Sequence, residues 1–164
     1  VAQVLLTKDI IDDPKRCSLV QDTFCRLLEL GCLPIVNEND TVSVEEIEFG
    51  DNDTLSALVA KICHADALVI LSDIDGLYDC DPREHAGAKL ISVVPEITQE
   101  IKDSATGAGS ARGTGGMITK IEAAEIVTQH GIPMAIINGD DPTHLYDLLD
   151  GNAIGTRFLP QEVK

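Results

Sequence analysis

The sequence predicts an α/β fold built on a largely parallel sheet. Apolar runs of strand length alternate along the 164 residues with segments of helical periodicity. Two of these runs, "ALVIL" and "IPMAII", are apolar at nearly every position. Runs of this kind are typical of strands buried on both faces, so the alternation indicates parallel strands covered by helices on both sides of the sheet.

The first half of the chain contains two predicted strands and two predicted helices. The strands are 1–6 and 33–36, and the helices are 15–30 and 53–64. Gly31 closes the first helix, because glycine readily adopts the backbone conformation that ends a helix. Asp51 or Asp53 is a candidate N-cap for the second helix.

The second half continues the alternation. The strands are 67–71 and 132–137, and the helices are 96–102, 117–130 and 142–149. Gly131 closes the long helix 117–130. The segment 103–116 is poor in apolar residues and holds five glycines, which makes it the one candidate for disorder.

Length and charge limit the classes of function. A chain of 164 residues has the size of one domain, and its net charge of −16 repels polyanions, so we expect no binding to nucleic acid. No apolar run approaches the roughly 20 residues of a membrane span. The five cysteines lack any CxxC pair, and we interpret them as reduced core residues of a cytoplasmic protein.

Polar clusters follow three of the predicted strands. They are "NEND" (37–40), "SDIDG" (72–76) and "NGDDP" (138–142). Ligands of open α/β sheets bind beyond the carboxyl ends of the strands, so these clusters are expected to border a ligand site.

The segment 41–49 alternates apolar and polar residues as a hairpin would. A hairpin would bring "NEND" beside "GDND" (50–53), and the polar groups Asn37, Asp40, Asp51, Asn52 and Asp53 would then converge. Clustered carboxylates repel unless a cation lies among them, which could be an ammonium group, Mg²⁺ or a lysine. The alternative is that one of these aspartates only caps the following helix.

A glycine-rich segment, "GTGGMITK" (113–120), leads into the helix that begins near Met117. Gly113, Gly115 and Gly116 let the backbone approach a ligand closely, and the helix start offers unpaired N–H groups that suit a phosphate. Lys120 near this positive helix end calls for a negative partner, such as a nucleotide phosphate. The alternative is a flexible linker before a surface lysine, since the segment matches neither standard nucleotide-binding motif.

The stretch "LSDIDGLYDCDP" (71–82) leaves a predicted buried strand. It places Ser72 and Asp73 at the strand end and Gly76 in a turn. Tyr78 is a candidate to lie beside a base or ribose, although it could equally pack under its own loop.

The segments "PIVNEND", "FGDNDTLSA", "VILSDIDGLYDCDP" and "GTGGMITKIEAAEI", in this order and spacing, resemble the glutamate 5-kinase branch of the amino acid kinase family. The resemblance runs from "AQVLLT" to "GTRF". It implies a three-layer αβα sandwich, with 1–164 as a single domain whose substrate loops are 37–53 and whose nucleotide-binding part is 67–164. The implied reaction is the ATP-dependent phosphorylation of the γ-carboxylate of L-glutamate to glutamyl 5-phosphate, the first step of proline biosynthesis.

The resemblance also implies roles for single residues. Asp40 and Asn52 would contact glutamate, with Asn37 near them, while Asp53 would hold the catalytic lysines and Lys120 would stabilise the transferring phosphoryl group. We expect Lys120 to be solvent-accessible. The nucleotide-binding positions are Ser72, Asp73, Thr114, Gly115, Gly116, Met117, Ile118, Thr119 and Lys120, together with Tyr78. ATP and Mg²⁺ are the implied cosubstrate and cofactor, and no side chain of this chain is assigned as a metal ligand.

The sequence departs from the family pattern in one respect. In this family a further strand, a glycine-rich loop with a second catalytic lysine, and a substrate serine precede "AQVLLT", and these 164 residues do not contain them. We therefore expect the chain to be N-terminally incomplete, with weak or no kinase activity alone. The alternatives are an inactive nucleotide- or proline-binding fragment, or a family member acting on another acid or on a nucleoside monophosphate. Family resemblance further implies feedback inhibition by proline and a homo-oligomer.

Overall fold

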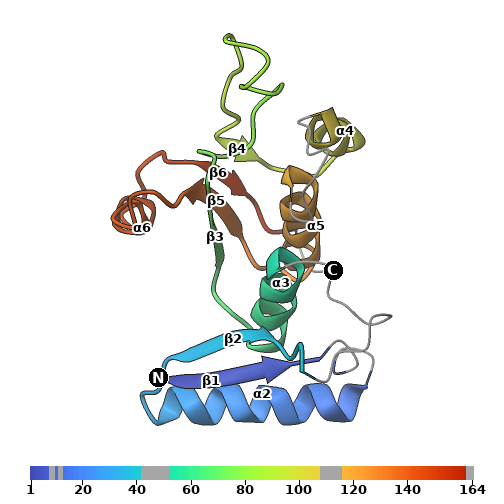
Figure 1. Cartoon of the computed structure of the whole chain (residues 1–164), viewed down its shortest axis with the longest axis vertical. Coiled ribbons are helices and arrows are strands. Elements are labelled where there is room, and N and C mark those ends of the chain that lie inside the picture. Colours follow the sequence, from blue (N-terminus) through green and yellow to red (C-terminus); the bar gives the residue numbers. More distant parts are fainter. Residues whose placement is uncertain (8–9, 11–12, 42–51, 108–115, 162–164) are drawn as a thin grey trace.

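The computed structural model describes residues 1–7, 10, 13–41, 52–107 and 116–161 (Figure 1). Strands and helices alternate along most of the chain. In order they are β1 (Ala2–Leu6), α2 (Pro14–Glu29), β2 (Pro34–Glu38), α3 (Asn52–Ile62), β3 (Leu68–Ser72), β4 (Val93–Val94), α4 (Gln99–Gly107), α5 (Met117–Thr128), β5 (Met134–Asn138), α6 (His144–Leu149) and β6 (Thr156–Phe158). The predicted α/β class is confirmed.

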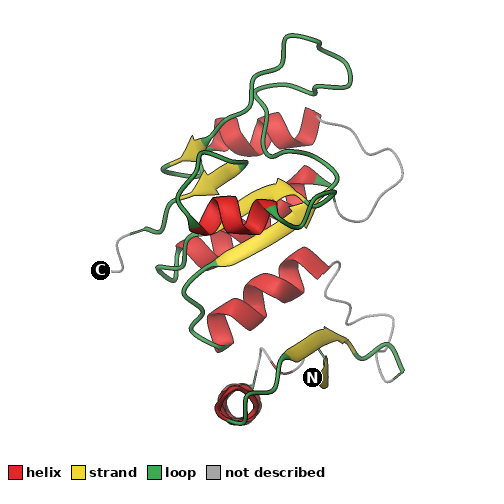
Figure 2. Ribbon diagram, turned by 90° about the vertical axis from the view of Figure 1, so that its left-hand side faces the viewer, coloured by secondary structure: helices red, strands yellow, loops and turns green. Residues whose placement is uncertain are grey.

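The strands of the described residues form two sheets. β1 and β2 pair in parallel, and the second sheet has the order β3-β5-β6-β4. Within the larger sheet β3–β5 and β4–β6 are parallel and β5–β6 is antiparallel. Helices α3 and α5 lie on one side of this sheet and α6 lies on the other, which gives three layers (Figures 1 and 2). The sequence led us to expect one sheet; in the described residues the smaller sheet stands apart and reaches the larger one through α3.

Local signals in the sequence account for the helix boundaries. Asp13 caps α2 by accepting hydrogen bonds from the backbone nitrogens of Lys15 at 2.9 Å and Arg16 at 3.3 Å. Gly31 and Gly131, which follow α2 and α5, have φ of +68° and +77°, a conformation that costs glycine little. The ends predicted for α2 and α5 therefore agree with the observed ones within two residues, whereas the helix predicted at 96–102 is observed at Gln99–Gly107.

Helix α4 corrects the expectation of disorder in 103–116. It begins at Gln99 and extends to Gly107, so the first part of that segment is helical, whereas 108–115 lie outside the described residues. Lys102 Nζ lies 2.8 Å from both carboxylate oxygens of Glu125, which ties α4 to α5. Ala105 is buried against the core of the larger sheet. Tertiary packing thus stabilises a helix that composition alone does not favour.

Helix α3 belongs to two hydrophobic cores. Ala57 and Ala60 are buried in the core between the larger sheet and α5. Leu55 is buried in a second core with Leu6 of β1 and Phe24 of α2. This helix therefore joins the two sheets and fixes the position of its own N-terminus relative to both.

The side chain of Thr156 links three segments of the larger core. It is fully buried, accepts a hydrogen bond from the backbone nitrogen of Leu77 at 2.8 Å, and donates one to the backbone oxygen of Ile91 at 2.7 Å. We expect Thr156→Val to lower the free energy of unfolding by about 2 to 4 kcal/mol, because the isosteric methyl group leaves both backbone groups unpaired. Urea unfolding followed by circular dichroism measures this. Thr143→Val, at an exposed hydroxyl, is the control, and equal small costs for both variants would contradict the assignment.

All five cysteines are described, and all are free thiols. None is fully buried: Cys25 is exposed and the other four are partly exposed, so the expectation of core cysteines is wrong. Cys17 and Cys25 lie in α2, whereas Cys32, Cys63 and Cys80 lie outside the helices and strands, and Cys63 packs against the second core.

Two thiols, Cys63 and Cys80, have a raised pKa. Burial, reinforced by the nearby Cys25 thiol, raises the pKa of Cys63 from 9.0 to about 11. Since only the thiolate is nucleophilic, we expect iodoacetamide at pH 8 to alkylate Cys63 about 100-fold more slowly in the folded chain than in urea. Mass spectrometry of the Cys63 peptide after timed alkylation measures the two rates. Equal rates would show that folding neither shields the Cys63 thiol nor raises its pKa.

Across the ranges that the structure describes, every helix is too short or too polar to cross a bilayer.

Candidate active site

Two of the predicted polar clusters meet at the carboxyl ends of β3 and β5. Ser72 and Asn138 are partners in the register of these strands. Asn138 Nδ2 donates a hydrogen bond to Asp75 Oδ1 at 2.8 Å, which connects the cluster 72–76 to the cluster 138–142. The third cluster, 37–40, begins in the last two residues of β2 and therefore lies at the end of the smaller sheet. The strand ends are thus polar where the sequence predicted.

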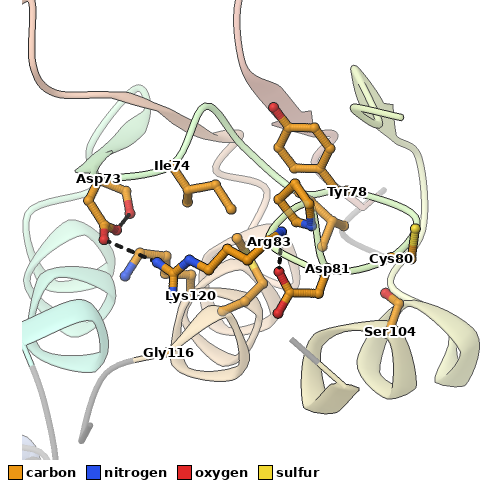
Figure 3. A pocket seen from close by; sticks show the side chains of 13 residues that line it. Asp73, Ile74, Tyr78, Cys80, Asp81, Arg83, Ser104, Gly116 and Lys120 are labelled. Carbon is orange, nitrogen blue, oxygen red and sulfur yellow. Dashed lines mark hydrogen bonds and ion pairs between the residues drawn. The ribbon is translucent and has the colours of Figure 1, made fainter. Parts of the chain in front are cut away.

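A pocket of about 220 Å³ opens beside this edge (Figure 3). It is bordered by the loop that follows β3, by α4 and by the start of α5. Its lining residues are Ser72, Asp73, Ile74, Leu77, Tyr78, Cys80, Asp81, Pro82, Arg83, Ser104, Gly116, Met117 and Lys120. Six of the predicted nucleotide-binding residues are in this set: Ser72, Asp73, Tyr78, Gly116, Met117 and Lys120.

The N-terminus of α5 faces the pocket. Gly116 is the N-cap residue, and no side chain makes a capping hydrogen bond there. The backbone N–H groups of the first helical turn are therefore available to an anion, and the helix dipole favours negative charge at this end. The 12-residue helix α5 thus contributes a phosphate-binding feature to a pocket that also contains a lysine.

Lys120 is held by Asp53, which belongs to a different helix. Lys120 Nζ lies 3.0 Å from Asp53 Oδ2, and the two side chains are only 12% and 16% exposed. Thr119 Oγ1 lies 2.8 Å from the same carboxylate oxygen and 2.8 Å from the backbone oxygen of Gly116. These contacts fix the ammonium group at the pocket wall, next to the start of α5.

This arrangement corrects one expectation about Lys120. We expected a solvent-accessible side chain, and it is largely buried. Asp53 lies beside the lysine, as the family resemblance implied, and a phosphate partner for Lys120 stays a prediction. Asp53 reaches the lysine because it stands in the first turn of α3, which packs against α5.

Arg83 and Asp81 line the pocket and were missed by the sequence analysis. Arg83 Nη2 lies 3.6 Å from Asp73 Oδ2, and Figure 3 shows the arginine side chain extending toward that carboxylate. Asp81 Oδ1 accepts a hydrogen bond from the backbone nitrogen of Arg83 at 2.8 Å, which turns the chain at this point. The side chains of Arg83 and Asp73 are 71% and 82% exposed. Their ion pair therefore contributes little to stability and is free to rearrange around a ligand.

Tyr78 makes a contact within its own loop while it lines the pocket. Its hydroxyl donates a hydrogen bond to Asp75 Oδ2 at 3.1 Å. Loss of hydration, followed by the hydrogen bond and the negative charge of Asp75, raises the pKa of Tyr78. The hydroxyl therefore stays protonated, and both interpretations made from the sequence remain compatible with its position.

The structure does not bring every predicted site residue to this pocket. Ile118 is 40% exposed and absent from the lining, and Thr119 contacts Asp53 instead. Asn52 lines a separate groove. Asn37 lies in β2 of the smaller sheet, and Asp40 lies two residues after this strand ends. Asp51, Thr114, Gly115 and the predicted hairpin 41–49 fall wholly or mainly outside the described residues. Their roles stay predictions.

Known proteins resemble this chain along nearly all of its length. It is 52% identical over 166 residues to the glutamate 5-kinase of Clostridium perfringens, which covers 99% of the chain and 62% of that relative. It is 54% identical over 158 residues to the glutamate 5-kinase of Deinococcus radiodurans, which covers 96% of the chain and 44% of that protein. The chain therefore spans only about half of the length of the curated relatives it matches.

Solved structures and a family profile agree with the fold. The carbamate kinase from Giardia lamblia bound to AMP-PNP superimposes with a TM-score of 0.65 at 23% identity, covering 86% of this chain and 49% of that one. The UMP kinase from Bacillus anthracis gives a TM-score of 0.60 at 16% identity, covering 85% and 50%. The profile of the amino acid kinase family matches residues 1–138. The chain belongs to the amino acid kinase family.

Proposed function

We propose that this chain is the part of a glutamate 5-kinase that binds ATP and contributes Lys120 to phosphoryl transfer onto the γ-carboxylate of L-glutamate. The observation that carries this proposal is the Lys120–Asp53 pair beside the open N-terminus of α5, in a chain that is 52% identical to a glutamate 5-kinase. The pair and the helix start lie at one wall of a pocket next to the strand ends, which is where α/β sheets bind ligands.

The chemistry of the reaction suits these groups. The glutamate carboxylate is itself the nucleophile, so phosphoryl transfer needs in-line positioning and neutralisation of charge more than a general base. Lys120 supplies a fixed positive charge, and Asp53 prevents it from swinging away. The N–H groups at the start of α5 would bind phosphate oxygens at the same wall of the pocket. Arg83 would leave Asp73 to add a second positive charge at the pocket mouth.

Mg²⁺ fits this site as a companion of ATP. Kinase sites hold this ion with one or two carboxylates together with phosphate oxygens, and Asp73 and Asp81 offer carboxylates at the pocket. Among the described residues no three His, Cys, Asp or Glu side chains are grouped to hold a metal alone. The ion would neutralise charge on the phosphates, and Asp73 would hold it at the pocket.

The glutamate site would lie between the two strand-end regions. Asn52 immediately precedes Asp53 in α3, which places it one residue from the group that holds Lys120. Asp40 follows β2 and would bind the substrate ammonium. The five free thiols fit a reducing compartment such as the cytoplasm, and the family resemblance adds proline as a feedback ligand and self-association of the kinase core.

The test is the formation of glutamyl phosphate, trapped as the hydroxamate, from L-glutamate and MgATP. It is performed with the 164-residue chain alone and with the chain mixed with the region of the Clostridium perfringens relative that it does not match. We expect glutamate-dependent hydroxamate in the mixture and weak or no activity from the chain alone. Hydroxamate formation from another acid at a higher rate, or phosphorylation of UMP, would transfer the chain to another substrate class.

Calorimetry separates turnover from binding. Titrations with MgATP, then with glutamate and proline, report whether the pocket binds its ligands at all. Binding of MgATP without hydroxamate in any mixture would favour a nucleotide-binding module over a kinase.

A further inference from the structure

Thr119 precedes Lys120 in α5, and its hydroxyl contacts the same aspartate. Thr119 Oγ1 lies 2.8 Å from Asp53 Oδ2, and Lys120 Nζ lies 3.0 Å from that oxygen. Two consecutive residues of one helix therefore bind a single carboxylate oxygen of another helix. Within the described part of the chain, the residues that line the pocket do not include Thr119. An effect of its hydroxyl on the reaction would therefore act through Asp53.

The hydroxyl of Thr119 has one proton and two acceptors within reach. They are Asp53 Oδ2 and the backbone oxygen of Gly116, each at 2.8 Å. Gly116 is the N-cap residue of α5, and the carbonyl of an N-cap residue accepts the first hydrogen bond of its own helix. A hydrogen bond to an ionised carboxylate is also stronger than one between neutral groups. The proton therefore goes mainly to Asp53.

The two side chains differ in how firmly they hold the carboxylate. Lysine carries its ammonium group on a flexible four-carbon stem, so the ion pair alone lets Lys120 Nζ move around Asp53 Oδ2. Threonine is branched at Cβ and stiff about its one side-chain torsion. The contact of Thr119 Oγ1 with the Gly116 carbonyl fixes that torsion against the helix start. Thr119 thus ties Asp53 to the backbone of α5, and Asp53 in turn holds the ammonium group.

These contacts join the first turns of two helices. Asp53 is in the first turn of α3, and Thr119 is the third residue of α5. The side chains of Asp53 and Lys120 are 16% and 12% exposed, and Thr119 is partly buried. Little water competes for the hydrogen bonds among the three residues, which strengthens each bond.

We propose that Thr119 is a positioning residue for phosphoryl transfer, which holds Asp53 and through it places the Lys120 ammonium group beside the start of α5. This proposal rests on the proposed function of Lys120. Rates depend steeply on such placement, since a displacement of about 1 Å can slow a reaction about 100-fold. The role differs from the one that the family resemblance implied for Thr119, which was contact with the nucleotide.

The first test is the steady-state kinetics of Thr119→Val, which removes the hydroxyl and keeps the shape of the side chain. The hydroxamate assay uses the chain together with the unmatched region of the Clostridium perfringens relative. We expect kcat to fall about tenfold and KM for MgATP to stay within about twofold, because the lysine acts mainly in the transition state. Thr119→Ser keeps the hydroxyl and should recover kcat to within about threefold of the wild type.

Thr128→Val is the matched control in the same helix. Thr128 Oγ1 lies 2.8 Å from the backbone oxygen of Ala124, and the residue is 1% exposed at the other end of α5. This substitution also removes a hydroxyl that bonds a helix carbonyl, so it measures the structural cost alone, and kcat and KM should not change. Circular dichroism checks folding. If Thr119→Val does not fold, Thr119→Ala removes the same hydroxyl with a smaller side chain and replaces it in both tests.

The second test needs no phosphoryl transfer. Heteronuclear NMR detects a lysine ammonium group when contacts hold it and slow the exchange of its protons with water. The signal of Lys120 is assigned by its loss in Lys120→Met. We expect this signal in the wild type, in Thr119→Ser and in Thr128→Val, and its loss in Thr119→Val.

The proposal is overturned if folded Thr119→Val keeps either its kcat or its Lys120 signal, or if Thr128→Val shows the same losses. An increase in KM for MgATP with unchanged kcat would also overturn it, because Thr119 would then contact the nucleotide directly. So would a Lys120 signal that is missing from the wild type. A wild type that forms no glutamyl phosphate refutes the proposed function instead, and the NMR comparison still decides whether Thr119 holds Asp53 and Lys120.

Discussion

We expect Lys120→Met to lower the rate of glutamyl phosphate formation by about 10²- to 10³-fold, because it removes the positive charge that we propose acts on the transferring phosphoryl group. The affinity for glutamate should change far less, since the lysine is placed to act on charge that develops during transfer. The measurement is the initial rate in the hydroxamate assay at saturating MgATP, with the same complementing segment for every variant.

The same substitution also affects stability. Lys120 and Asp53 are 12% and 16% exposed, so removing the lysine leaves a largely buried carboxylate, to which Thr119 still donates a hydrogen bond within the described part of the chain. We expect the free energy of unfolding to fall by about 1 to 3 kcal/mol, somewhat less than the cost of breaking a fully buried ion pair. A cycle of Lys120→Met, Asp53→Asn and the double variant separates the pairwise coupling from the single losses.

Lys102→Met is the matched control for both effects. Lys102 also pairs with a carboxylate, Glu125 at 2.8 Å, but the two side chains are 36% and 34% exposed and join α4 to α5. This variant should keep its rate within a few-fold and lose less than about 1 kcal/mol. If Lys120→Met keeps its full rate while remaining folded, Lys120 has no part in the mechanism.

The sequence predicted the positions of the helices and strands better than it predicted which strands pair with one another. Buried strands were found because β5 is apolar at nearly every position, and helix ends were found because Gly31 and Gly131 mark them. β4 and β6 were missed, because strands of two and three residues carry no periodic signal. The split into two sheets could not be read from the sequence either, since hydrophobic pattern predicts a strand without saying which edge it pairs with.

The candidate site, too, could be predicted only in part, because the sequence does not show which distant residues lie close together. Asp53 and Lys120 are 67 residues apart, and only the family resemblance connected them before the structure placed them 3.0 Å apart. The burial of Lys120 was missed because lysine side chains are usually exposed. Arg83 escaped notice in a loop without periodicity, although the adjacent Asp81, a residue favoured in turns, was a signal that the chain reverses there.

Gly155→Ala should be the most destabilising single substitution among the glycines with positive φ. Gly155 has φ of +64°, and an added Cβ would lie 2.7 Å from Ile137 Cγ2 and closer still to the backbone oxygen of Ile136. Both neighbours belong to β5 and are fully buried, so neither can move without disturbing the centre of the larger sheet. We expect a loss of about 4 kcal/mol or more, which combines backbone strain with overpacking.

Gly151→Ala separates these two contributions. Gly151 has φ of +85°, and an added Cβ would meet no atom within 4 Å. It carries the conformational cost alone, about 1 kcal/mol, so the difference between the two variants measures how closely the turn before β6 approaches β5. Urea unfolding of both proteins provides the comparison. Equal losses in the free energy of unfolding would mean that β5 moves away from the added methyl group at little cost. Close packing of the turn against β5 would then not explain the β5–β6 pairing.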